Sequence, residues 1–217
     1  MKTAAPSFRR RSILLAAAGV LAVVLTACTG VGGGYLPPGA SVGSGVVFTG
    51  QASFGFTFSC EDKGGVNPPT GQLRIELSYT DHGSSVLLGA PFSIHGIVDK
   101  IDPVLESAIC IGRNPPPPPE NQLIFLGRYR PTTSPPPGLL QSCPTRETTT
   151  SPLCRFEVIV QDNDKNLAPS PGDFFSIKLS NATILDCTTP LQCSQLPPAK
   201  VFYARAGYLA GGNLTVK

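Results

Sequence analysis

The chain has 217 residues, of which 41% are hydrophobic and only 14% charged, so a disordered polyelectrolyte is excluded. Glycine and proline contribute 23 residues each, and because both disfavour helices they exclude a mainly helical protein or a coiled coil. The formal charge of +3 belongs to the first 27 residues. Beyond them, 13 basic residues face 14 acidic ones, a balance that argues against a nucleic-acid partner.

Residues 1–27 have the pattern of an export signal peptide. Three arginines, Arg9 to Arg11, precede an uncharged apolar run from Ile13 to Leu25. That run is shorter than the roughly 20 residues of a membrane-spanning helix. Arg10 and Arg11 also resemble a twin-arginine signal, so the export route stays open between the general secretory and twin-arginine pathways.

The end of this leader resembles the bacterial lipobox, in which signal peptidase cuts just before a diacylated cysteine. The matching residues are Leu25-Thr26-Ala27-Cys28. Two or more acyl chains hold a protein stably on a bilayer. The resemblance therefore implies lipidation of Cys28, with the lipid bilayer as partner and an extracytoplasmic location on the cell membrane or outer envelope. The alternative is an ordinary secretory signal followed by a chance cysteine.

Residues 28–45 are rich in glycine and predict a flexible lipidated tether, which leaves 46–217 as the folded domain. The tether contains a formal nucleophile-elbow match, Gly39 to Gly43 around Ser41. That motif needs a strand before the serine and a helix after it. A chance match is the favoured interpretation.

Short runs of alternating apolar and polar residues then follow one another, as expected for strands with one buried face. The clearest runs contain Phe54, Phe56 and Phe58, and residues 73–79. Further runs lie at 46–48, 92–97, 108–111, 123–129, 155–160, 175–179, 201–208 and 214–216. So many short strands predict an all-β fold, an antiparallel β-sandwich or barrel-like domain. The proline-rich segments 113–120 and 131–153 are predicted surface loops, because proline cannot donate within a central strand.

Six cysteines remain once Cys28 is set aside, an even number typical of disulfides in an exported domain. They are Cys60, Cys110, Cys143, Cys154, Cys187 and Cys193. Short loops favour Cys143–Cys154 and Cys187–Cys193, which leaves Cys60 with Cys110, although 15 pairings are formally open. A metal–thiolate site is disfavoured because no Cys-x-x-Cys or finger-like His spacing occurs.

One acidic loop predicts a calcium site. Its candidate ligands are Asp162, Asp164, Asn166 and Asp173, oxygen donors at alternating positions with an acid at the twelfth. The loop departs from the known pattern at Leu167, which occupies the usual glycine position. The alternative is an Asx-rich hairpin turn in which Asp162 and Asp173 anchor adjacent strands. No other cofactor is predicted.

Residues 81–85 collect the residue types of a hydrolytic triad, Asp81, His82 and two serines. Neighbours on a strand point to opposite faces, so adjacency does not bring such groups together. We therefore expect a hairpin loop with His82 exposed, a structural role for His95, and no catalytic residue. A hydrolase would have to use carboxylates for which the sequence offers no pairing.

Five blocks of the chain resemble, in order, a β-rich module of secreted bacterial proteins, the post-COAP type. These blocks are residues 50–56, 71–82, 156–163, 172–177 and 207–216. The resemblance implies an extracellular β-module without known catalytic residues. The extra cysteines and the two proline-rich insertions depart from that module.

Together these features predict a membrane-anchored, non-catalytic envelope or surface lipoprotein that binds an unknown envelope ligand or has a structural role. The alternatives are a small cell-envelope hydrolase and a calcium-dependent binding domain.

Overall fold

The computed structural model describes residues 28–62, 71–83, 91–97, 122–132, 138–163, 172–189, 192 and 195–216. These residues build an all-β structure, with no helix of seven or more residues in the described part. A nine-stranded antiparallel sheet has the order β10-β9-β8-β7-β6-β5-β4-β1-β11. Its strands are β1 (Cys28–Leu36), β4 (Ala52–Asp62), β5 (Gly71–Asp81), β6 (Phe92–Ile97), β7 (Gln122–Pro131), β8 (Cys154–Gln161), β9 (Phe174–Ser180), β10 (Val201–Tyr208) and β11 (Gly211–Val216).

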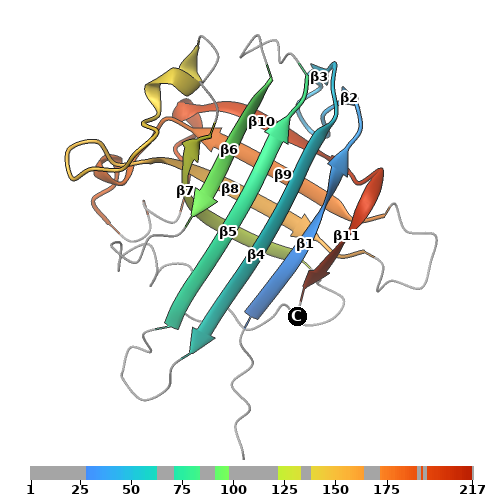
Figure 1. The fold of residues 1–217 in the computed structure, drawn as a ribbon, viewed down its shortest axis with the longest axis horizontal. Helices are drawn as coiled ribbons and strands as arrows, with labels where there is room; N and C mark the ends of the chain where they lie inside the picture. Colours follow the sequence, from blue (N-terminus) through green and yellow to red (C-terminus); the bar gives the residue numbers. More distant parts are fainter. Residues whose placement is uncertain are drawn as a thin grey trace, which may run out of the picture.

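The sheet curls into a half-barrel, so that β1, β4, β5 and β6 lie across β7 to β10 with the core between them (Figure 1). The alternating phenylalanines of β4 point into this core. Phe54 stacks on Phe175 of β9, with ring centroids 3.7 Å apart, and Phe56 and Phe58 lie against Phe125 of β7. The predicted all-β sandwich or barrel-like fold is confirmed.

Each predicted strand that falls on described residues is present, with ends that coincide with the prediction or differ from it by up to four residues. The run at 108–111 lies outside the described residues. Short 3-10 helices occupy the connections: η1 (Leu139–Ser142), η2 (Ile184–Asp186) and η3 (Pro198–Lys200).

The predicted tether over residues 28–45 is wrong, because its first nine residues form β1, an interior strand paired with β4 on one side and β11 on the other. Gly30, Gly32 and Gly34 lie opposite Phe58, Phe56 and Phe54 in the register with β4. Cross-strand partners share a face of the sheet, so these glycines face the core. A Cβ on Gly34 would clash with the carbonyl oxygen of Gly211. The glycines thus permit close packing, and the folded sheet already includes Cys28–Leu36, ahead of the predicted domain start at residue 46.

The end of the predicted tether and the predicted strand at 46–48 together form a small hairpin, in which β2 (Gly39–Ala40) pairs with β3 (Val47–Phe48). This hairpin is attached to β10. The Val42 amide donates to the Ala206 carbonyl at 2.9 Å, and the Ala206 amide donates to the Ser41 hydroxyl at 2.9 Å.

Candidate functional site

A buried polar cluster lies at the end of the half-barrel next to the β2–β3 hairpin. Its centre is Asp81, the last residue of β5, whose side chain is fully buried. The carboxylate accepts hydrogen bonds from the Gly83 amide at 2.9 Å and the Tyr203 hydroxyl at 2.6 Å. Arg205 Nη1 lies 3.1 Å from the same carboxylate, and Tyr79 shares a hydrogen bond with Tyr203. The cluster joins β5 to β10 across the core.

Arg205 connects this cluster to the chain segments around the hairpin. Its Nη2 donates to the carbonyl oxygens of Pro37 at 2.9 Å and Gly50 at 2.7 Å. The guanidinium also lies over the Phe48 ring, 4.5 Å from its centroid, an arrangement that favours a cation. One buried cation therefore holds both ends of the hairpin against β10.

The two tyrosines of the cluster are held in the neutral form. Burial raises the pKa of Tyr79 well above its usual 10, and the nearby Asp81 carboxylate raises it further. Burial also raises the pKa of Tyr203, with additional contributions from Tyr79 and Asp81. Both hydroxyls therefore remain available as hydrogen-bond donors at neutral pH, as a structural network requires.

A hollow of about 260 Å³ opens between the β2–β3 hairpin and β10. Its walls are largely apolar and include Pro37, Pro38 and Phe48. Val42 and Tyr208 on its wall are both substantially exposed. Arg205 also contributes to the lining, but its contacts with Asp81 and backbone carbonyls already engage the guanidinium.

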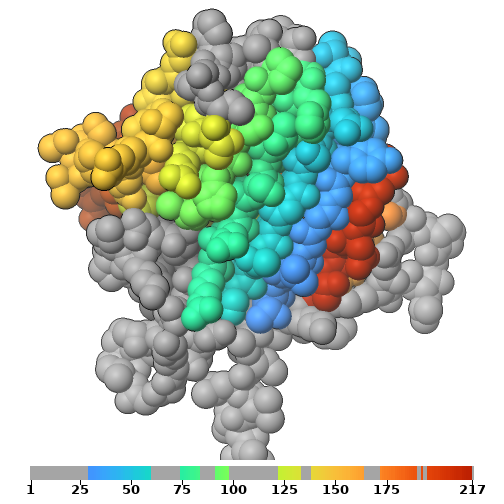
Figure 2. Space-filling model, in the orientation of Figure 1, coloured from blue at the N-terminus to red at the C-terminus, as the bar shows by residue number. Residues whose placement is uncertain are grey.

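A second, more open hollow of about 220 Å³ lies on the outer face of β4, β5 and β6. Its lining includes Thr57, Glu76, Ser78 and His95. The strands that carry these residues lie side by side on the face shown in Figure 2. His95 is half-buried on this outer face and is paired in register with Ser78, and its structural role stays a prediction.

The triad-like residues diverge, as the alternation of a strand requires. Asp81 points into the core, whereas His82 is exposed and its Nε2 lies 3.0 Å from the Ser53 hydroxyl. Ser84 and Ser85 lie outside the described residues. Ser41 of the nucleophile-elbow match follows the two-residue strand β2 and precedes a turn. Its hydroxyl accepts a hydrogen bond from the Ala206 amide. Asp81 bonds Gly83 and Tyr203 instead of orienting His82 as the acid of a triad would, and the Ser41 hydroxyl is engaged with the backbone.

Two of the four candidate calcium ligands bind the backbone of β11. Asp173 accepts hydrogen bonds from the Leu214 amide at 2.8 Å and the Asn163 amide at 2.9 Å. Asp162 accepts one from the Val216 amide at 3.1 Å. Both carboxylates are buried. By accepting hydrogen bonds from backbone amides of the edge strand β11, they serve as the anchors that the hairpin-turn alternative requires.

The remaining calcium candidates, Asp164 and Asn166, lie outside the described residues. Within the described ranges, no three His, Cys, Asp or Glu side chains are grouped closely enough to hold a metal ion. The calcium site stays a prediction.

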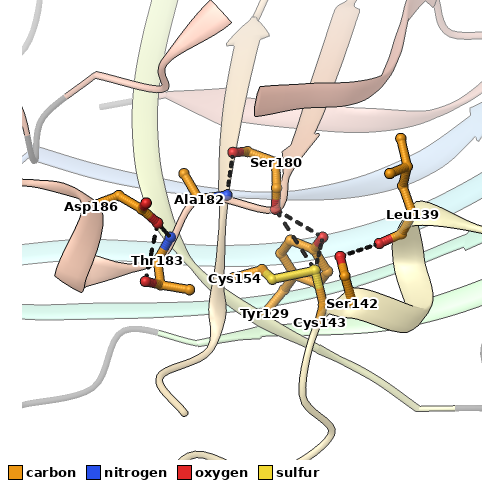
Figure 3. The surroundings of a disulfide bond; sticks show 9 residues. All are labelled: Tyr129, Leu139, Ser142, Cys143, Cys154, Ser180, Ala182, Thr183 and Asp186. Carbon is orange, nitrogen blue, oxygen red and sulfur yellow. Dashed lines mark hydrogen bonds between the residues drawn. A yellow bond between two sulfur atoms is a disulfide. The ribbon is translucent and has the colours of Figure 1, made fainter. Parts of the chain in front are cut away.

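The Cys143–Cys154 disulfide is confirmed, with the two Cα atoms 5.5 Å apart. It joins the residue after η1 to the first residue of β8 and closes the predicted loop (Figure 3). The hydroxyl of Tyr129 lies 3.1 Å from Cys143 Sγ and donates to the Ser180 carbonyl at 3.1 Å. The disulfide is therefore packed into the core between β7 and β9.

The other predicted pairings are not settled by the described residues. Cys187 takes part in a disulfide, while Cys110 and Cys193 lie outside the described residues. The register of β1 with β4 places Cys28 directly opposite Cys60. A bond between these two cysteines would exclude lipidation of Cys28 and the Cys60–Cys110 bridge, which stays a prediction.

The sequence analysis named Asp81 as a triad-like acid and did not predict its cluster with Arg205, although the strands carry a signal for that cluster. Asp81 continues the buried alternation of Ile75, Leu77 and Tyr79, and Arg205 is in phase with Tyr203. A charged side chain on the buried face of a strand needs an oppositely charged or hydrogen-bonding partner. Among the described strands three arginines are buried, Arg128, Arg155 and Arg205, so the pattern predicts a cationic partner for Asp81 without saying which arginine it is.

No family model, curated protein or solved structure matches this chain. None of the helices among the described residues combines the length and the apolar character needed to cross a bilayer.

Proposed function

We propose that this chain is a bacterial envelope lipoprotein, anchored through Cys28 and carrying a non-catalytic β-module with a binding or structural role. The observation that carries the proposal is the sequence Leu25 to Cys28 at the exit of a short apolar run. An apolar residue, two small residues and a cysteine are what a lipoprotein signal peptidase recognises. The resemblance to post-COAP modules supports the same location outside the cytoplasm.

The contacts inside the domain support a structural use of its reactive side chains. Asp81 bonds Tyr203 and a backbone amide, and Ser41 and Asp173 bond backbone amides. Side chains committed to such bonds serve the framework, because changing their partners would unpair buried polar groups. The candidate hydrolase residues are therefore better explained as parts of the fold.

Metabolic labelling with an alkyne-tagged fatty acid in a bacterial host tests the anchor. We expect the natural chain to incorporate the label and Cys28→Ala to lose it. The double variant Cys143→Ala/Cys154→Ala, which also removes cysteines but keeps the lipobox, serves as the matched control and retains the label. An unlabelled natural chain, or a labelled Cys28→Ala variant, contradicts the proposal.

A further inference from the structure

The residue proposed as the anchor, Cys28, is also the first described residue of the sheet. β1 begins at Cys28, and its pairing with β4 already includes Cys28 opposite Cys60. Its pairing with β11 begins two residues later, at Gly30 opposite Val216. A chain cleaved and acylated at Cys28 therefore has no spacer between the lipid and an interior strand.

From this geometry we infer that the acylated domain stands on the bilayer in a fixed orientation, with the Cys28 end of the sheet against the lipid headgroups. The inference rests on the proposed anchor. A Gly-rich spacer of 18 residues would let a domain rotate freely. A strand hydrogen-bonded on both sides cannot reorient without the sheet that contains it.

The partner that this end of the molecule meets is thus a lipid surface, and the opposite end faces away from it. At about 3.3 Å per residue, β1 separates Leu36 from Cys28 by about 26 Å. The β2–β3 hairpin and the hollow beside it adjoin Leu36. Figure 1 shows β2 and β3 at the end of β1 opposite to the end where the C-terminal strand β11 finishes. The orientation presents the hairpin, the hollow and Tyr208 to the space beyond the membrane.

The lack of tryptophan in the chain allows a single reporter to measure this orientation. Ser59→Trp places it one residue from Cys60, at the level of Cys28, and Val47→Trp places it on the exposed hairpin. The full-length variants are produced in a bacterial host, extracted and reconstituted in phosphatidylcholine vesicles that carry a headgroup spin label. Near-ultraviolet circular dichroism and thermal melting establish that each variant is folded.

We expect the spin label to quench Ser59→Trp several-fold more than Val47→Trp. A matched control inserts twelve Gly and Ser residues between Cys28 and Thr29, and this spacer is expected to abolish the difference. Vesicle flotation separates the two levels of the hypothesis. Protein that floats but shows equal or reversed quenching overturns the orientation alone, whereas protein that does not float overturns the anchor and the orientation together.

Discussion

The cluster of Asp81, Tyr79, Tyr203 and Arg205 shows how single buried polar residues shape this domain. Removing an ion from water is unfavourable unless partners replace the lost hydration. Asp81 and Arg205 meet that requirement with each other, with Tyr203 and with backbone groups. Because those backbone groups belong to connections far apart in sequence, the ion pair fixes where the connections cross the end of the half-barrel.

Buried tyrosines give the protein a predictable alkaline sensitivity. Burial raises the pKa of Tyr79, Tyr129 and Tyr203 above the value of about 10 expected in the unfolded chain. Their protonated forms stabilise the fold fully below pH 10, and this contribution is lost as the pH rises through the folded pKa values. The free energy of unfolding should therefore fall above pH 10, by about 1.4 kcal/mol per pH unit for each of these tyrosines.

Denaturant unfolding between pH 8 and 11, combined with tyrosine absorbance, measures this effect. Tyr129→Phe is the comparison variant, because it removes one titrating group and should flatten the dependence. Ionisation of all five tyrosines near pH 10 while circular dichroism still reports a folded protein would contradict the prediction.

At the scale of the element, β1 shows that glycine in a strand can be a packing residue. The Gly34→Ala substitution is expected to lower the free energy of unfolding by about 1–3 kcal/mol, because a methyl group there meets the Gly211 carbonyl oxygen. The matched control is Gly55→Ala on β4, where the nearest atom to a new Cβ is the Ser78 hydroxyl at 3.4 Å. Chemical denaturation measures both variants. Equal stabilities would favour a tether over a strand at residues 28–36.

The edge strand β11 depends on two carboxylates from the β8–β9 connection. In Asp173→Asn, one of the two oxygens that accept backbone amides becomes an NH₂ donor, which faces another donor. We expect a loss of about 1–3 kcal/mol in the free energy of unfolding, with or without a calcium chelator. Glu76→Gln, an exposed change on β5, should remain within about 0.5 kcal/mol of the natural chain.

Thermal and denaturant melts compare these variants directly. If the loss caused by Asp173→Asn disappeared in the presence of chelator, the carboxylate would be serving a bound ion and the turn-anchor interpretation would be wrong.

Local patterns in the sequence were sufficient for most strands and for one disulfide. The alternation of Phe54, Phe56 and Phe58 indicates the buried face of one strand without reference to any other part of the chain. The Cys143–Cys154 disulfide joins residues only 11 positions apart. The role of β1 was not predictable in this way, because a glycine carries no side chain that reveals its neighbours. Its packing depends on β11, which follows it by about 180 residues. The Tyr203–Asp81 bond likewise joins residues 122 positions apart.

At the scale of the whole molecule, the proposed export signal and lipobox combine with the sheet in a single arrangement. In this proposal the leader directs the chain out of the cytoplasm, acylation holds Cys28 on the bilayer, and β1, which contains Cys28, connects that attachment to the half-barrel. Cys60 lies opposite Cys28 in the register of β1 with β4. The chemical state of the Cys28 sulfur therefore decides whether the proposed anchor exists, since a sulfur that carries a diacylglyceryl group cannot form a disulfide.

The most direct test is the intact mass of the membrane-extracted protein, measured before and after complete reduction and alkylation. We predict a chain that starts at Cys28, carries the acyl groups, and takes up six alkyl groups out of the seven cysteines. A chain that takes up seven alkyl groups, or one that still includes residues 1–27, would contradict the account.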